Sequence, residues 1–317
     1  MFYFKPILIL LLVLLSSCGQ GTKQSVKIQQ FPVVTVPSII GSQQEAIEWM
    51  AKNYWNKFLD TTQTFSTDTS LVGNIPRDDF RKHFMEYSQI LWSTAPKIGV
   101  EAQYRFINKA ISVESKYPKT NILENILELS ELYLYDVNSP LRNEEFFLPI
   151  ADVLSKSELS DDITKEKYNK IFSDCSINRV GEIATNFTFS TKSGKSSRLH
   201  DIKSDYVFLF FSNPGCSACL EIIKAIIHSE KINGLINSKK LSILNLYIDE
   251  NLGEWIKYME IYPTTWINAY NPNIEITSQE LYSIRAIPTI YILDKNKRVI
   301  LKDAPQNIAL NFVESLD

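Results

Sequence analysis

Apolar residues follow a helical period through the middle of the chain. Between residues 42 and 175 they recur every three or four positions, and strand-like alternation is scarce. Ser42 and Glu45 have the spacing of a capping box, and Pro96 should end the second helix because proline cannot extend the hydrogen-bond ladder. The pattern therefore predicts an all-helical domain over residues 42–178. Its helices are expected to begin after Ser42 and after Pro76 and to continue over residues 97–116, 120–135, 143–155 and 162–174.

The hydrophobic pattern changes near residue 180. Residues 186–190 alternate as a half-buried strand does, whereas residues 206–212 and 241–248 are nearly continuous apolar runs typical of strands covered on both faces. Strands mixed with helices predict a second domain over residues 179–317, with a central mixed sheet flanked by helices. The other elements expected in this domain are a helix behind Cys219, helices over 253–261, 278–284 and 306–316, and strands over 290–293 and 299–301.

The chain begins with the layout of a secretory signal. Lys5 precedes nine uninterrupted aliphatic residues, 7–15, too few for a membrane-spanning helix. The segment ends in Leu-Ser-Ser-Cys at Cys18, which resembles the bacterial lipobox, so residues 1–17 are expected to be cleaved and Cys18 lipidated. An ordinary signal peptide followed by an incidental cysteine is the alternative. Residues 18–41 are polar and are expected to form a flexible tether reaching about 75–80 Å.

The residues after Cys18 predict a location for the mature protein. Gly19 stands where an aspartate commonly retains lipoproteins at the inner membrane, and the next acidic residue is Glu45. By analogy with lipoproteins, the protein is expected to be anchored in the outer membrane and to face the periplasm.

Composition excludes several classes of function. Lys and Arg number 33 against 36 Asp and Glu, a net charge of -3, so the chain lacks the broad basic surface that nucleic-acid binding requires. The 4 cysteines are too few for a disulfide-stapled scaffold or for iron–sulfur and zinc arrays.

Candidate chemistry lies where the first buried strand of the second domain ends. Residues 213–219 read Asn-Pro-Gly-Cys-Ser-Ala-Cys and lead into a helix. Backbone N–H groups and the dipole at a helix N-terminus favour a thiolate, so we expect Cys216 to be exposed with a lowered pKa and to attack disulfides. Cys219, one turn later, would then resolve the mixed disulfide. The pair would alternatively be a structural disulfide, or half of a zinc site completed by Cys175, His200 and His228.

The order of motifs in the second domain resembles the thioredoxin fold, and in particular periplasmic thiol–disulfide oxidoreductases of the TlpA/ResA type. A Cys-x-x-Cys opens a helix, and Ile287-Pro288-Thr289 precedes the final hairpin about 70 residues later. The resemblance implies that the Cys216–Cys219 disulfide is the redox centre, with no further cofactor and no metal. It also implies a cis Pro288 beside the pair and an Ile287 that binds substrate main chain. An ordinary proline that starts an edge strand is the alternative.

The resemblance extends to substrates and partners. Pro214 and Gly215 belong to the implied substrate-binding surface. Protein or small-molecule thiols and disulfides are the implied substrates, and a reductase would need a membrane electron donor. The helical region resembles a domain of unknown function that is fused to such domains in lipoproteins.

Several residues depart from this family or have two interpretations. Phe210 stands where thioredoxins have a buried aspartate, and Ile222 where TlpA/ResA-type proteins often have a glutamate, with Glu221 one position early. Cys175 is interpreted as a small buried hydrophobe or as a third redox cysteine. The aromatic residues near His83, and the group Trp255, Tyr258, Tyr262 and Trp266, are interpreted as core packing or as walls of a binding groove.

The leading hypothesis is a lipid-anchored thiol–disulfide oxidoreductase. A thiol-dependent peroxidase would use the same cysteine, although the chain lacks a Pro-x-x-x-Thr/Ser-x-x-Cys motif. The third hypothesis is a binding or scaffold lipoprotein whose helical domain is the active part.

Overall fold

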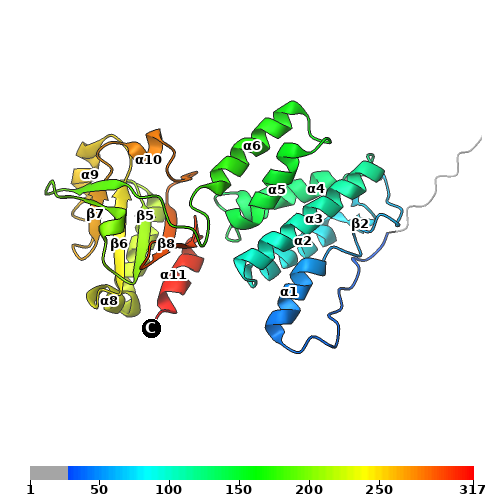
Figure 1. Ribbon diagram of the computed structural model, residues 1–317, viewed down its shortest axis with the longest axis horizontal. Helices are drawn as coiled ribbons and strands as arrows, with labels where there is room; N and C mark the ends of the chain where they lie inside the picture. Colours follow the sequence, from blue (N-terminus) through cyan, green and yellow to red (C-terminus); the bar gives the residue numbers. More distant parts are fainter. Residues whose placement is uncertain (1–27) are drawn as a thin grey trace, which may run out of the picture.

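A computed structural model describes residues 28–317. The chain forms two domains that lie side by side, an N-terminal helical domain and a C-terminal domain built on a sheet (Figure 1). The predicted fold class, a helical region followed by a mixed sheet flanked by helices, is confirmed. Within residues 28–317 no helix is both long and apolar enough to cross a membrane. The expected signal, residues 1–17, and Cys18 lie outside the described part of the chain.

The helical domain consists of six α-helices, one π-helical turn and a two-stranded hairpin among the described residues. Ser42 caps the first helix in the predicted capping box with Glu45. The elements are α1 (Gln43–Asn53), β1 (Leu71–Val72), β2 (Ile75–Pro76), α2 (Arg77–Trp92), α3 (Pro96–Lys116), α4 (Ile122–Ser130), η1 (Glu131–Tyr135), α5 (Glu144–Lys156) and α6 (Asp162–Ser176).

Aromatic side chains form much of the core of this domain. Trp55 and Phe106 lie at the centre, with their ring centroids 5.0 Å apart, and both are at most 2% exposed. The aromatic residues are therefore core packing rather than the walls of a groove. His83 lies at the rim of this core, where its side chain remains 29% exposed.

Part of the expected tether packs on the helical domain. Phe31 is only 8% exposed, stacks on His83 at 4.2 Å between centroids, and meets Trp55 edge-on at 5.3 Å. The N–H of Gln29 donates to the carbonyl of Asn74 at 2.9 Å. The expectation of a flexible tether over residues 18–41 is thus wrong around Phe31. The Phe31 side chain is buried against aromatic residues of the helical domain, and this packing fixes the segment.

The C-terminal domain is built on a seven-stranded sheet in the order β4-β3-β7-β6-β5-β8-β9. The central strand β5 (Tyr206–Phe211) is parallel to β6 (Leu241–Tyr247) and antiparallel to β8 (Thr289–Asp294). The other strands are β3 (Thr188–Thr191), β4 (Ser196–Arg198), β7 (Ile267–Tyr270) and β9 (Val299–Leu301). The helices are η2 (Leu199–Asp201), α7 (Ser217–His228), α8 (Glu230–Asn237), α9 (Leu252–Tyr258), α10 (Glu275–Ser278) and α11 (Gln306–Glu314).

The sheet buries side chains on both faces. One face packs against α7, α8, α9 and α11, with Phe208 and Phe210 among its buried residues. The other face, which includes Leu209 and Phe211, is covered by the segments around Phe187, Leu199 and α10. Burial on both faces explains why β5 is a continuous apolar run.

Several elements were not predicted from the sequence, and one helix was misplaced. The hairpin β1–β2, β4, α8 and β7 were not expected, because these strands are short and Ser229 divides what reads as one helical stretch into α7 and α8. The helix expected over residues 278–284 is wrong. The helix α10 ends at Ser278, and Glu280 has a φ of 49°, which an α-helix does not accommodate.

Candidate active site

The candidate site lies where β5 ends and α7 begins. Gly215 turns the chain there with a φ of 78°, a left-handed conformation that glycine adopts without steric cost. Cys216 then occupies the N-cap of α7, and its Sγ accepts a hydrogen bond from the N–H of Cys219 at 3.1 Å. The buried strand thus fixes the position of the first cysteine at a helix N-terminus.

Cys216 and Cys219 form a disulfide, with their Cα atoms 5.2 Å apart. The two sulfurs differ in access, since Cys216 is half-buried whereas Cys219 is 2% exposed. When the disulfide is reduced, the Cys219 N–H and the dipole of α7 would both favour the Cys216 thiolate. The geometry therefore leaves one sulfur of the pair accessible and buries the other.

The segment before β8 lies beside the disulfide. The Ile287–Pro288 peptide bond is cis, and the carbonyl oxygen of Ile287 lies 3.9 Å from Cys216 Sγ. Strand β8 brings it there because Thr289 pairs with Phe211, the last residue of β5. Ile287 and Pro288 are both half-buried, so part of each faces solvent close to Cys216.

Pro214 and Gly215 directly precede Cys216 in the turn between β5 and α7. Gly215 is exposed and Pro214 half-buried, and a Cβ added to Gly215 would lie 3.6 Å from Tyr258 Oη. Tyr258 is the half-buried member of the aromatic group that includes Trp255, Tyr262 and Trp266. The other three are at most 6% exposed and pack in the core, and Tyr262 and Trp266 also line a cavity beside β3 and β7. Of this group, Tyr258 is the member that borders the candidate site.

The positions at which related proteins carry carboxylates are apolar. Phe210 and Ile222 are at most 1% exposed, and Glu221 faces solvent on α7. The structure reveals a buried polar chain that sequence analysis missed, in which Asn245 accepts from Ser212 Oγ at 2.5 Å and donates to Asn268 at 3.0 Å. Its only signal was an asparagine inside an aliphatic strand, and it contains no carboxylate.

The remaining cysteine and histidine candidates do not join this site. Cys175 lies in the last turn of α6 with 0% exposure, and burial raises the pKa of its thiol, which identifies it as a buried hydrophobe. The ring nitrogens of His200 and His228 contact the carbonyls of Ala184 and Lys224. Over residues 28–317 no three side chains of metal-ligating type come together, so the zinc-site alternative has no ligand set there.

Comparisons with known proteins match both domains. A family described as "Domain of unknown function (DUF5106)" matches residues 16–178, and a family described as "Thioredoxin-like" matches residues 204–299. A crystal structure of a thioredoxin-like protein from Bacteroides caccae is 32% identical, with a TM-score of 0.75. The match covers 90% of this chain and 98% of that protein.

Curated relatives match the C-terminal domain. The thiol-disulfide oxidoreductase ResA of Halalkalibacterium halodurans is 23% identical over 133 residues, 42% of this chain and 73% of the relative. ResA of Bacillus cereus is 26% identical over 135 residues, 43% of this chain and 75% of the relative. The expected class, an oxidoreductase of thioredoxin-like fold, is confirmed by these relatives. The chain therefore belongs to the DUF5106 family, with a thioredoxin-like domain following the family's helical region.

Proposed function

We propose that this protein is a lipid-anchored thiol–disulfide oxidoreductase that exchanges disulfides through Cys216 and Cys219. One observation carries the proposal. The half-buried Cys216 Sγ lies at the N-cap of α7 and accepts the N–H of Cys219, whose own sulfur is bonded to it and buried. A permanent structural disulfide would not need a partly exposed sulfur at a helix N-terminus.

Exchange proceeds in two balanced steps when the protein acts as a reductant. The Cys216 thiolate attacks one sulfur of the substrate disulfide, which forms a mixed disulfide and releases one substrate thiolate. Cys219 then loses its proton and attacks Cys216 Sγ, which releases the second substrate thiolate and closes the Cys216–Cys219 disulfide. Two electrons pass from the protein to the substrate, and the reverse sequence oxidises a dithiol.

The substrate main chain would lie along the cis-proline segment. Ile287 places its carbonyl 3.9 Å from Cys216 Sγ, so an extended peptide bonded to this backbone would carry its disulfide to the attacking sulfur. Pro214 and Gly215 would bound the peptide on the other side.

Substrates, partner and location form the finer part of the proposal. Protein or small-molecule disulfides and dithiols are the expected substrates, and the Cys216–Cys219 pair would need no cofactor. A membrane electron donor would supply electrons if the protein works as a reductase in an oxidising compartment. Lipidation of Cys18 would hold the protein at the outer membrane, facing the periplasm.

Trapping experiments test the exchange. The wild-type protein should reduce insulin with dithiothreitol as electron source, and Cys216→Ser should abolish this activity. Cys219→Ser should accumulate mixed disulfides that migrate as larger species on non-reducing gels. Cys175→Ser is the matched control and should exchange as the wild type does. An inactive wild type, or a Cys216→Ser variant with full activity, would refute the proposal.

Labelling experiments test the anchor. Cells fed labelled palmitate should incorporate it into the wild-type protein and not into Cys18→Ser, and only the wild type should fractionate with outer membranes. Incorporation into Cys18→Ser would show that the lipid is attached elsewhere.

A further inference from the structure

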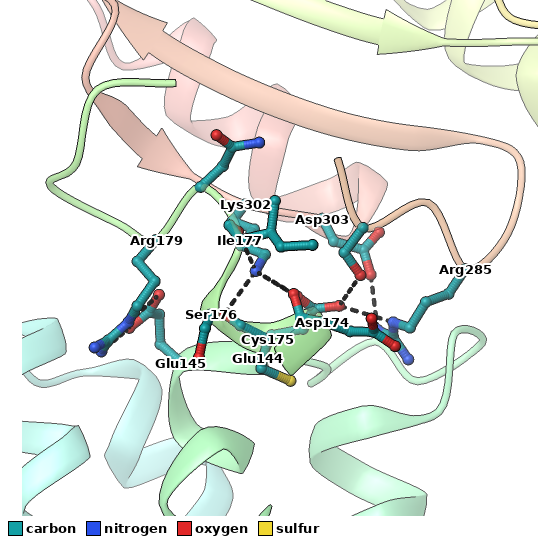
Figure 2. Close-up of polar contacts among 12 residues, drawn as sticks. Glu144, Glu145, Asp174, Cys175, Ser176, Ile177, Arg179, Arg285, Lys302 and Asp303 are labelled. Atoms are coloured by element: carbon teal, nitrogen blue, oxygen red, sulfur yellow. Dashed lines mark hydrogen bonds and ion pairs between the residues drawn. The ribbon is translucent and has the colours of Figure 1, made fainter. Parts of the chain in front are cut away.

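A buried cluster of charged side chains joins the two domains. The helical domain contributes Glu144, at the start of α5, and Arg142, and the C-terminal domain contributes Arg285, Lys302 and Asp303 (Figure 2 shows all of these but Arg142). Every one of these side chains is at most 14% exposed. None of the functional features described above uses this cluster.

Glu144 bridges two cations of the C-terminal domain. Its Oε1 lies 2.8 Å from Arg285 Nε, and its Oε2 lies 2.8 Å from Lys302 Nζ. The Arg285 guanidinium also lies 2.8 Å from Asp303 Oδ2 and 4.1 Å from the ring centroid of Tyr135, whose carbonyl accepts from it. Arg285 therefore contacts Glu144, Tyr135 and Asp303, and the first two of these residues belong to the helical domain.

Backbone carbonyls at the end of α6 stabilise the excess positive charge of the cluster. Three cations face two carboxylates in the cluster, and Lys302 Nζ donates to the carbonyls of Cys175 at 2.8 Å and Ile177 at 2.6 Å. These carbonyls lie at the C-terminal end of α6, where the helix dipole favours a cation. Each charge of the network therefore has an opposite charge or a backbone carbonyl beside it, and a buried network of this kind is weak evidence of added stability.

Arg285 belongs to the segment that leads into the cis-proline. Residues 279–288 lie outside regular secondary structure, and their N–H groups bond the main chain only as far as Leu281, so the position of the rest depends on side-chain contacts. Several of these contacts reach the helical domain or the junction that follows it. Lys170 pairs with Glu280 at 3.2 Å, and Asn178 donates to the carbonyl of Leu281 at 2.9 Å. Arg285 is the residue nearest to Ile287 and Pro288 in this segment that contacts the helical domain through an ion pair.

We infer that Glu144 is a positioning residue of the redox site, through which the helical domain fixes the substrate-binding segment 285–288 by way of Arg285. The helical domain is then part of how the protein binds an extended substrate. This inference rests on the proposed function of Ile287 and Pro288. It assigns to the DUF5106 region a specific task, namely to hold one backbone segment of the neighbouring domain.

The chain offers a matched control one residue away. Glu145 is also buried, at 4% exposure, and pairs with Arg179 at 2.7 Å and with the N–H of Val180 at 3.1 Å. It therefore joins the same helix to the domain junction without contacting segment 285–288. Glu144→Gln and Glu145→Gln remove one buried carboxylate each and preserve side-chain shape, so they differ chiefly in the segment they release.

Kinetics on the full chain distinguish the two variants. Glu144→Gln should raise the KM for insulin about tenfold relative to Glu145→Gln, with a smaller change in kcat, because a displaced backbone binds extended substrate poorly. The second-order rate constant for reduced protein with the small disulfide 5,5′-dithiobis(2-nitrobenzoate) should fall much less than kcat/KM for insulin. Equal KM values for the two variants would overturn the inference.

Hydrogen–deuterium exchange gives a readout that is independent of activity. Peptides covering residues 279–290 should exchange faster in Glu144→Gln than in Glu145→Gln, and unchanged protection would overturn the inference. If Glu144→Gln does not fold, Arg285→Lys provides the second variant, since it keeps the charge and loses the forked contacts. A wild type inactive on both disulfides would refute the proposed function and remove the role in binding, whereas normal activity with unaltered variants would refute this inference alone.

Discussion

Replacing Phe31 by alanine should destabilise the helical domain, because this side chain packs into the aromatic core from outside the regular helices. A phenylalanine buries about 150–250 Å², and at about 25 cal/mol per Å² its burial is worth roughly 4–6 kcal/mol. Phe31 retains 8% exposure and packs at the half-exposed rim beside His83, where neighbouring residues can relax. We therefore expect a loss of about 3 kcal/mol, at the low end for Phe→Ala in a core.

Chemical and thermal unfolding measure this loss. The expected change lowers the Tm of the helical domain by about 6–12 °C, which circular dichroism or calorimetry resolves easily. Val33→Ala is the control, because Val33 is 75% exposed and its loss should change stability by about 0.5 kcal/mol or less. If Phe31→Ala is no more destabilising than Val33→Ala, the segment around Phe31 does not pack on the domain and the reasoning is refuted.

Three further predictions follow from burial and backbone geometry. In the reduced, folded protein at pH 8, iodoacetamide should modify Cys216 and spare Cys175, whose thiol is buried with a raised pKa, and peptide mapping that finds equal labelling would contradict this. Burial raises the pKa of Tyr104 to about 12 and also raises the pKa of Tyr291, so above pH 10 the unfolded chain releases protons that the folded chain keeps. The free energy of unfolding should therefore fall as the pH rises from 10 to 12, and denaturant titrations showing constant stability would disprove this. Gly215→Ala should lower the free energy of unfolding by about 1–2 kcal/mol, because an alanine there must adopt a φ of 78°. The backbone conformation alone causes this loss, since an added Cβ would make only an ordinary contact with Tyr258 Oη. An unchanged denaturation midpoint would contradict this prediction.

The fold class and the Cys216–Cys219 pair were recognisable in the sequence because their signals are local. A helical period arises from neighbours three and four positions apart, and an apolar run such as residues 206–211 records burial on both faces of a strand. Cys216 and Cys219 are recognisable because one turn of helix brings them together whatever the rest of the fold does. The short strand β7 was missed because four residues, two of them polar or small, are too few to establish a period.

The tertiary structure alone decided which residues far apart in the sequence share an environment. Nothing near Glu144 indicates that its carboxylate will meet Arg285, 141 positions later, or that Phe31 will stack on His83. The first contact depends on how the two domains pack together, and the second on how an irregular segment packs on the helical domain. Each contact involves a single residue on either side, so it leaves no periodic pattern in the sequence. Local sequence thus determined where the paired cysteines lie, whereas long-range packing determined what holds the backbone beside them.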